Sequence, residues 1–153
     1  MKPENRMISK VHTALDARIV YAEKTHNPLR AGVPDCYYEG QRTAWIEYKF
    51  LPSIPVKATF SLGRGLGKGK SILTELQDRW LTRAFNSGAH AMVAVVVGFK
   101  NSSRTYRFRI FPAPELWQNE YGETGDELLR YSLSLEDYRD FLYEKLAPGH
   151  RRA

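Results

Sequence analysis

The spacing of apolar residues predicts one amphipathic helix near the start of the chain and another near its middle. From residue 4 to residue 15, apolar positions recur every three or four residues, as on the buried side of a helix. They are Met7, Ile8, Val11, Ala14 and Leu15. The second helix is expected to follow Thr74, which forms a capping-box pair with Gln77, and to stop at Gly88.

Shorter runs rich in β-branched and aromatic residues predict the strands of a sheet. Their expected positions are residues 17–25, 35–38, 42–50, 89–99 and 104–111. A polar turn, "EGQ", would join the second and third strands. Residues 51–70 are predicted to be a loop rich in glycine and basic residues. A last helix is expected to begin after Ser134 and to end near Leu146.

The order of these elements is a helix, three strands, a helix, two strands and then helices. It predicts an α/β fold in which helices flank a central mixed sheet. With 153 residues, the chain has the size of one compact domain, so we expect residues 1–153 to form a single domain. Its core would span about residues 4–111, and an acidic helical extension would span about residues 112–153.

Composition narrows the class of protein. The chain is 42% hydrophobic and 26% charged, which is typical of a globular protein in water. The longest apolar run is too short to cross a bilayer, and the first residues lack the apolar centre of a signal peptide. We therefore expect a cytoplasmic protein with no membrane partner. Cys36 is the only cysteine, which excludes an intrachain disulfide and a multi-cysteine zinc site.

Positive charge is concentrated in the first three quarters of the chain. Residues 1–114 carry 18 Lys and Arg against 8 Asp and Glu, whereas residues 115–144 carry nine acids and two bases. A body this basic attracts polyanions, and nucleic acid is the commonest of these in a cytoplasm. Solubility alone would also explain the charge.

One predicted strand places opposite charges side by side on one face. Strand alternation puts Trp45, Glu47 and Lys49 on the same face, and the parity of Asp35 in the preceding strand allows it to join them. Two neighbouring carboxylates favour a bound cation, and Mg²⁺ prefers carboxylate oxygens with water. Lys49 could orient the attacking water or offset charge on a phosphate. The trio therefore indicates metal-assisted hydrolysis of a phosphodiester.

The motif "GVPD" at residues 32–35, followed by "EYK" at residues 47–49, resembles the signature of the PD-(D/E)XK nuclease superfamily. The predicted elements are also similar to its restriction-endonuclease-like αβββαβ core. With the segment "LTELQDRWLTRAFNSGAHAMVAVV", the motifs look most like the VRR-NUC branch and small phage-type Holliday-junction resolvases. The resemblance covers roughly residues 4–98.

The resemblance implies a Mg²⁺- or Mn²⁺-dependent endonuclease that cuts DNA, with branched or junction DNA as its substrate. Asp35, Glu47 and the backbone carbonyl of Tyr48 would bind the metal. It also implies that Glu4 on the first helix helps to organise the metal and that Gln77 approaches the same site. Paired cuts in a two-fold symmetric junction would call for a homodimer. The apolar faces of the last helix or of the 104–111 strand could supply its interface.

Each of these residues also has an ordinary structural explanation. Glu4 stands in the first turn of a helix, where the helix dipole favours an acid in any protein. Gln77 could serve the capping box alone. Glu47 and Lys49 could form a salt bridge on a solvent-facing edge, although the neighbouring tryptophan argues against full exposure. Asp35 could simply begin a strand after a proline.

The segment "GRGLGKGKS" at residues 63–71 predicts a flexible basic loop that contacts DNA phosphates. The expected contacts are Lys57, Arg64, Lys68 and Lys70. A Walker A motif would need glycine in place of Arg64, which excludes that reading. Arg107 and Arg109 share one face of their predicted strand, and either solvent exposure or DNA contact would explain this.

The main alternative to an enzyme is a DNA-binding module that keeps the nuclease fold but does not cut. Such a protein would bind DNA in a salt-sensitive manner without metal-dependent cleavage. The joint presence of Asp35, Glu47 and Lys49 favours the enzyme, because a retired site would be expected to lack one of them. A structural accessory that binds a basic partner through the acidic C-terminal segment has no motif in its support.

Overall fold

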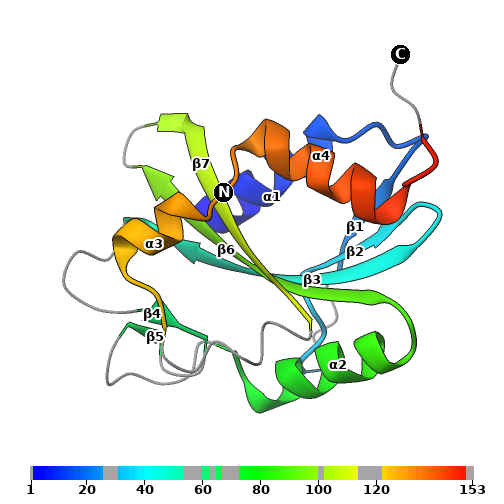
Figure 1. Ribbon diagram of the computed structural model, residues 1–153, viewed down its shortest axis with the longest axis horizontal. Helices are drawn as coiled ribbons and strands as arrows, with labels where there is room; N and C mark the ends of the chain where they lie inside the picture. Colours follow the sequence, from blue (N-terminus) through cyan, green and yellow to red (C-terminus); the bar gives the residue numbers. More distant parts are fainter. Residues whose placement is uncertain are drawn as a thin grey trace.

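The computed structural model describes a five-stranded sheet with helices on both faces (Figure 1). The described residues are 2–25, 31–53, 60–62, 65–66, 73–99, 102–113 and 122–150. The helices are α1 (Pro3–Ala14), α2 (Glu75–Asn86), α3 (Gly125–Arg130) and α4 (Leu135–Leu146). The strands of the main sheet are β1 (Tyr21–Lys24), β2 (Cys36–Glu39), β3 (Thr43–Leu51), β6 (His90–Phe99) and β7 (Ser102–Pro112). A separate two-stranded sheet consists of β4 (Phe60–Ser61) and β5 (Gly65–Leu66).

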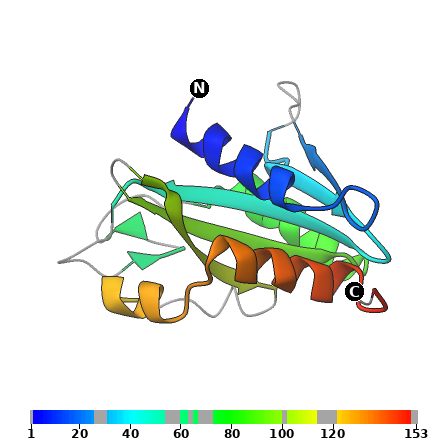
Figure 2. The same cartoon turned by 90° about the horizontal axis from the view of Figure 1, so that it is seen from above.

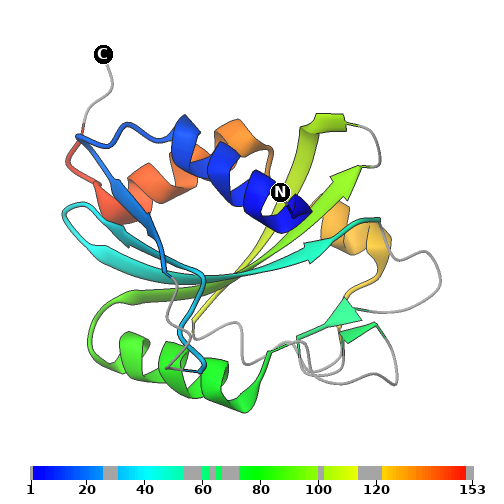
Figure 3. The ribbon, with the colours of Figure 1, turned by 180° about the vertical axis from the view of Figure 1, so that it is seen from behind.

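The strand order β1-β2-β3-β6-β7 makes the main sheet mixed, as the sequence predicts. β3 and β6 are parallel, and the other neighbouring pairs are antiparallel. A parallel pair needs a crossover connection, and α2 lies in the connection between β3 and β6. α1 and α4 lie side by side on one face of the sheet, and α2 covers the other face (Figures 2 and 3).

Apolar side chains fill both faces of the sheet. On the face covered by α1 and α4, the strands contribute buried residues such as Ile46 and Phe108. On the α2 face, Val93 and Val95 pack with Leu81 of the helix. Residues 91–98 of β6 are buried throughout, because helices cover the strand from both sides. This explains why β6 reads as a continuous apolar run rather than an alternating one.

Buried tyrosine hydroxyl groups connect two strands to two helices. The hydroxyl of Tyr48 on β3 lies 2.7 Å from the hydroxyls of Tyr38 on β2 and Tyr138 on α4. His12 of α1 extends this chain, since its Nε2 lies 3.0 Å from the Tyr38 hydroxyl. All three tyrosines are at most 1% exposed. The network therefore holds the middle of β3 against both helices on that face.

Two segments differ from the prediction. The first strand begins only at Tyr21, because residues 17–19 form a turn in which the amides of Ile19 and Val20 donate to the Asp16 carbonyl. Residues 51–70 are not loop throughout, since β4 and β5 pair within them. Phe60 is fully buried and exchanges two backbone hydrogen bonds of 2.7 Å with Glu123. Because Glu123 is distant from Phe60 in the sequence, no local pattern predicts this pairing.

Contacts within the chain account for the two arginines on one face of β7. Arg109 forms an ion pair with Glu123, and the two side chains are only 22% and 11% exposed. Arg107 donates to the Ser132 hydroxyl at 3.0 Å and to the Ser132 carbonyl at 2.8 Å. Both arginines therefore hold the segment around α3 against the sheet.

The C-terminal helix α4 contributes to the main core although it lies beyond the region of resemblance. Its Tyr138, Leu142 and Leu146 are fully buried in the same cluster as α1 and the sheet. Ser134 caps it as predicted, accepting from the Asp137 amide at 3.1 Å. The apolar faces of α4 and β7 are thus covered within one chain, which removes them as the proposed dimer interface. No helix in the described ranges is long and apolar enough to cross a membrane.

Candidate active site

The pairing of β2 with β3 ends at a point that brings two distant acidic residues together. The register between these strands stops at Cys36 opposite Ile46, whereas β3 stays paired with β6 as far as Leu51. Asp35 immediately precedes β2, so it lies beside the stretch of β3 that continues past the end of its partner. The side chain of Asp35 can therefore reach the backbone of β3 there.

Two hydrogen bonds join Asp35 to β3, one to Glu47 and one to Tyr48. The amide of Asp35 donates to Glu47 Oε2 at 3.1 Å, and the amide of Tyr48 donates to Asp35 Oδ2 at 2.9 Å. The carbonyl of Asp35 also accepts from the Thr25 amide at 2.8 Å, which ties this point to the end of β1. Both carboxylates are thus held at one place in the sheet.

Lys49 and Gln77 complete the cluster around Glu47. The ammonium of Lys49 lies 3.1 Å from Glu47 Oε1 and donates to Gln77 Oε1 at 3.2 Å. The amide nitrogen of Gln77 donates to Glu47 Oε1 at 2.7 Å, while Gln77 Oε1 also accepts from the Thr74 amide at 2.9 Å. The capping role of Gln77 and its contact with the site, which the sequence presents as alternatives, therefore occur together.

The loop that precedes Asp35 packs against the start of α2. Gly32 has a φ of +88°, and a Cβ added there would lie 2.6 Å from Leu76 Cβ and 2.7 Å from the Leu76 carbonyl. Leu76 is the residue before Gln77. Glycine is needed at residue 32 both for the positive φ and for this close approach. The contact fixes the Gly-Val-Pro-Asp loop relative to the helix that carries Gln77.

Burial makes both carboxylates costly to ionise. Glu47 is only 3% exposed, and its burial together with the charge of Asp35 raises the pKa of Glu47 to about 7, against the opposing effect of Lys49. Burial also raises the pKa of Asp35, although the Tyr48 amide and the charges of Lys49 and Lys24 act to lower it. An additional cation would therefore stabilise the ionised pair.

Glu4 approaches the same pair from the first turn of α1. Burial and the charge of Asp35 raise the pKa of Glu4, while the charges of Lys49, Lys24 and Lys2 lower it. Glu4 is thus within electrostatic reach of Asp35 and Lys49. Since α1 and α2 cover opposite faces of the sheet, the first turns of both helices flank this site.

The structure therefore brings together Asp35, Glu47, Tyr48, Lys49 and Gln77 by direct contacts, with Glu4 nearby. The four predicted DNA-contacting residues, Lys57, Arg64, Lys68 and Lys70, lie outside the described residues. Sequence reasoning missed two charges beside Glu4, those of Lys2 and Lys24. The four-residue spacing of Lys2, Arg6 and Lys10 is the signal that could have drawn attention to α1.

A metal ion at this site would need ligands beyond side-chain donors. In the part of the chain that the structure covers, no group of three or more His, Cys, Asp or Glu side chains is arranged to hold a metal. The two carboxylates of Asp35 and Glu47 would have to be joined by backbone, water or substrate oxygens. Such a shell is typical of Mg²⁺, which usually keeps one or two protein carboxylates together with phosphate oxygens.

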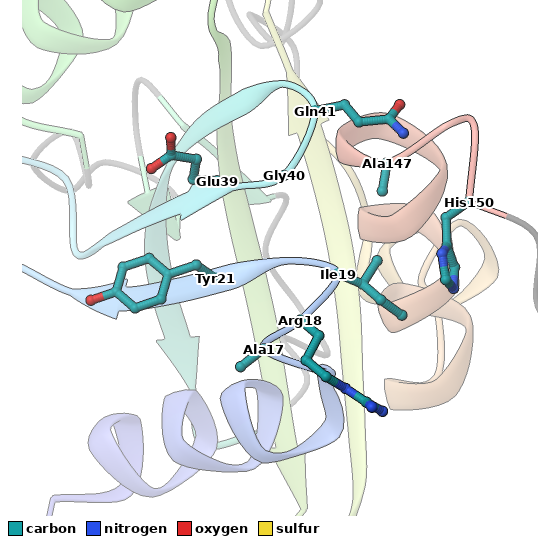
Figure 4. Close-up of a pocket in the computed structure, with 9 residues that line it drawn as sticks. All are labelled: Ala17, Arg18, Ile19, Tyr21, Glu39, Gly40, Gln41, Ala147 and His150. Atoms are coloured by element: carbon teal, nitrogen blue, oxygen red, sulfur yellow. The ribbon is translucent and has the colours of Figure 1, made fainter.

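A surface pocket of about 360 Å³ lies away from this site (Figure 4). It is formed at the turn between β2 and β3, beside the residues that lead into β1 and those that follow α4. Its lining includes Arg18, Tyr21, Glu39 and His150. It shares no residue with the carboxylate cluster, which is at the other end of β2.

The architecture of the described residues matches a solved structure of nuclease-like α/β fold. The structure is similar to that of Archaeoglobus fulgidus Hjc, a Holliday junction resolvase from an archaeal hyperthermophile, with a TM-score of 0.51 and 16% sequence identity. The match covers 89% of this chain and 96% of the resolvase chain. No family model and no curated protein matches the sequence. The fold predicted from the order of elements is thereby confirmed.

Proposed function

We propose that this protein is a metal-dependent endodeoxyribonuclease of the PD-(D/E)XK type, most like the VRR-NUC and phage-type resolvase branch. The observation that carries the proposal is the cluster of Asp35, Glu47 and Lys49 at the point where β2 ends, on a nuclease-like fold. Because a solved structure of similar fold is a Holliday junction resolvase, branched DNA is the substrate class that we propose.

A divalent ion, Mg²⁺ or Mn²⁺, fits the chemistry of the donors. Asp35 and Glu47 offer carboxylate oxygens, and burial raises the pKa of both groups, so a further positive charge would stabilise their ionised forms. The N–H and C=O groups of one strand residue point to the same side, so the Tyr48 carbonyl would face the side on which its amide meets Asp35. These groups would hold the ion, with Glu4 assisting through water. When bound, the ion would activate water and polarise the phosphate.

The side chains of this site would have distinct roles in the reaction. Lys49 would orient the attacking water and offset the negative charge that develops on the phosphate. Gln77 would position Glu47 and Lys49, to both of which it is hydrogen-bonded. In-line attack of water on phosphorus would break the bond to the 3′ oxygen and leave a 5′-phosphate.

The proposal includes the whole chain. Residues 1–153 would form one nuclease domain, with its core at about residues 4–111 and the helical extension after it. Two copies would act on a two-fold symmetric junction, because paired cuts need two sites. Lys57, Arg64, Lys68 and Lys70 would contact DNA phosphates.

The test compares four-way junction, flap, linear duplex and single-stranded DNA with Mg²⁺, Mn²⁺ or EDTA. We expect cleavage that requires the metal and is fastest on branched DNA. Lys49→Ala should slow cleavage by about 100-fold or more, whereas the affinity for a junction in EDTA should stay close to that of the parent.

Arg42→Ala is the matched control, since it removes one positive charge from an exposed turn residue at the far end of β2. It should cut at the parental rate. If the parent binds junctions but never cuts them with either metal, the protein is the non-catalytic DNA-binding module. If Lys49→Ala cuts as fast as the parent, the assigned roles are wrong.

A further inference from the structure

The helix α1 carries a row of exposed positive charges that begins at the candidate site. Lys2, which precedes the helix, and then Arg6 and Lys10 follow one another at four-residue spacing, which places them on one side of a helix. All three are exposed. Glu4 is the only acidic residue of α1, and it lies beside the carboxylate pair. We call these three residues the α1 basic row.

The start of the row is close to the residues that would hold the scissile phosphate. Lys2 is two residues before Glu4, and the amide of Thr25, at the end of β1, donates to the Asp35 carbonyl at 2.8 Å. Lys24 of β1 also donates to the side chain of Asn5 on α1. Lys2 and Lys24 therefore place positive charge on the side of the site where α1 begins.

The neighbouring helix has the opposite charge. α4 lies beside α1 on the same face of the sheet (Figures 2 and 3). Its exposed acidic residues are Glu136, Asp137, Asp140 and Glu144. The helix has two basic residues, and one of these, Arg139, already pairs with Asp140. A polyanion on this face would be attracted to α1 and repelled by α4, so the two helices together define one path.

We propose that the α1 basic row holds the phosphate backbone of one DNA arm as it leaves the active site. This inference rests on the proposed function and adds a surface on which the substrate would lie. From Lys2 to Lys10 a helix rises about 12 Å, roughly the axial length of three to four phosphates of one strand. Contacts of this kind position the duplex without reading its sequence.

The experiment replaces all three residues by glutamine, in Lys2→Gln/Arg6→Gln/Lys10→Gln. The Kd of a fluorescein-labelled four-way junction is measured by anisotropy in EDTA over a series of KCl concentrations. We expect the slope of log K against log salt to become shallower by about 2.7, since each lost phosphate contact accounts for about 0.9. At a fixed salt of about 0.1 M, affinity should fall by roughly tenfold or more.

A second triple variant, Arg42→Gln/Arg83→Gln/Arg130→Gln, removes the same charge from exposed residues away from the row. Its slope should stay close to that of the parent. Equal changes in both triples, or an unchanged slope in the row variant, would overturn the inference and leave the row as a solvated helix face. The three single variants, each expected to change the slope by about 0.9, provide the same test if the row triple proves unstable to heating.

Failure of this inference and failure of the proposed function give different results. Cleavage of the same junction with Mg²⁺ is measured for the parent in parallel. A parent that cuts, combined with a row variant of unchanged slope, rejects the basic row alone. A parent that does not cut, combined with a shallower slope in the row variant, rejects the nuclease and supports the row as a DNA-binding surface.

Discussion

Glu47 keeps a carboxylate inside a sheet, where the ionised form is costly. The side chain accepts from Gln77 and lies 3.1 Å from the Lys49 ammonium, yet burial and the charge of Asp35 still raise its pKa to about 7. A buried carboxylate of this kind is stabilised more by a bound cation than a carboxylate at the surface would be. Its stability effect and its proposed role in binding metal are therefore two consequences of the same burial.

We predict that Glu47→Gln stabilises the metal-free protein at pH 8. Because the pKa of Glu47 is higher in the folded state than its ordinary value of 4.5, the folded state binds the proton more tightly. The free energy of unfolding of the parent should thus rise as the pH falls from above 7 towards 5. Removing the charge should raise it at pH 8 by on the order of 1–3 kcal/mol and much less at pH 5, as measured by urea denaturation in EDTA.

Exposed Glu144 offers the control for this substitution, since Glu144→Gln should leave stability within about 0.5 kcal/mol at both pH values. Added Mn²⁺ should raise the melting temperature of the parent but not of Glu47→Gln. A Glu47→Gln protein less stable than the parent at pH 8 in EDTA would show that the ionised carboxylate is not a destabilising group.

The glycine of the Gly-Val-Pro-Asp motif matters for packing as well as for backbone conformation. We predict that Gly32→Ala lowers the cleavage rate by about tenfold or more, because the new methyl would push the start of α2, and with it Gln77, away from Asp35. Gly88→Ala is a matched control: Gly88 has a φ of +93° but nothing within 4 Å of an added Cβ. Gly88→Ala should lower the free energy of unfolding by about 1–2 kcal/mol through the positive φ alone, and it should cut DNA at the parental rate. Equal cleavage rates in the two variants, measured well below both melting temperatures, would contradict this account.

At the level of elements, the site forms where β2 ends beside the longer strand β3. β3 is longer than β2 and continues along β6 after β2 has ended, so the residue just before β2 meets the middle of β3. Helices then close the site from both faces, with Glu4 supplied by α1 and Gln77 by α2. The site is thus assembled from four elements, of which two were recognisable as a hairpin in the sequence.

The helix α4 behaves as part of the core rather than as an addition to it. We predict that Leu142→Ala lowers the free energy of unfolding by about 2–5 kcal/mol, the range for truncating a fully buried leucine. Urea denaturation measures the change, and Glu144→Ala, at an exposed position of the same helix, should cost less than about 0.5 kcal/mol. A cost for Leu142→Ala no larger than that of the control would mean that α4 is dispensable for the fold.

For the whole molecule, the main question is whether two copies act together. If a homodimer cuts a junction symmetrically, an excess of Lys49→Ala mixed with the parent should form mixed dimers with one active site. We predict that cruciform plasmid is then converted mostly to the nicked form rather than to the linear form. Agarose gels of the two products at increasing ratios of variant to parent measure this. An unchanged ratio of linear to nicked DNA would indicate copies that act independently.

Much of the fold and part of the site could be predicted because they depend on local patterns. Helix caps at Thr74 and Ser134 and the alternation along β3 follow from neighbours within a few residues. The pairing of Arg109 with Glu123 and that of Phe60 with Glu123 could not be predicted in this way. These residues are far apart in the sequence, and no repeating pattern connects them. Their pairing is therefore seen only in the folded structure.

The sequence by itself determined that Glu47 and Lys49 share a face of one strand, because side chains alternate along any extended chain. It also determined that a helix begins after Thr74. Only the tertiary structure decided that β2 ends where Asp35 can reach β3, that Gln77 caps its helix and contacts Glu47 at once, and that positive charge on α1 continues from the site. These outcomes depend on strand register and on which helix face packs inward. Both are determined by contacts among many residues that are distant in the sequence.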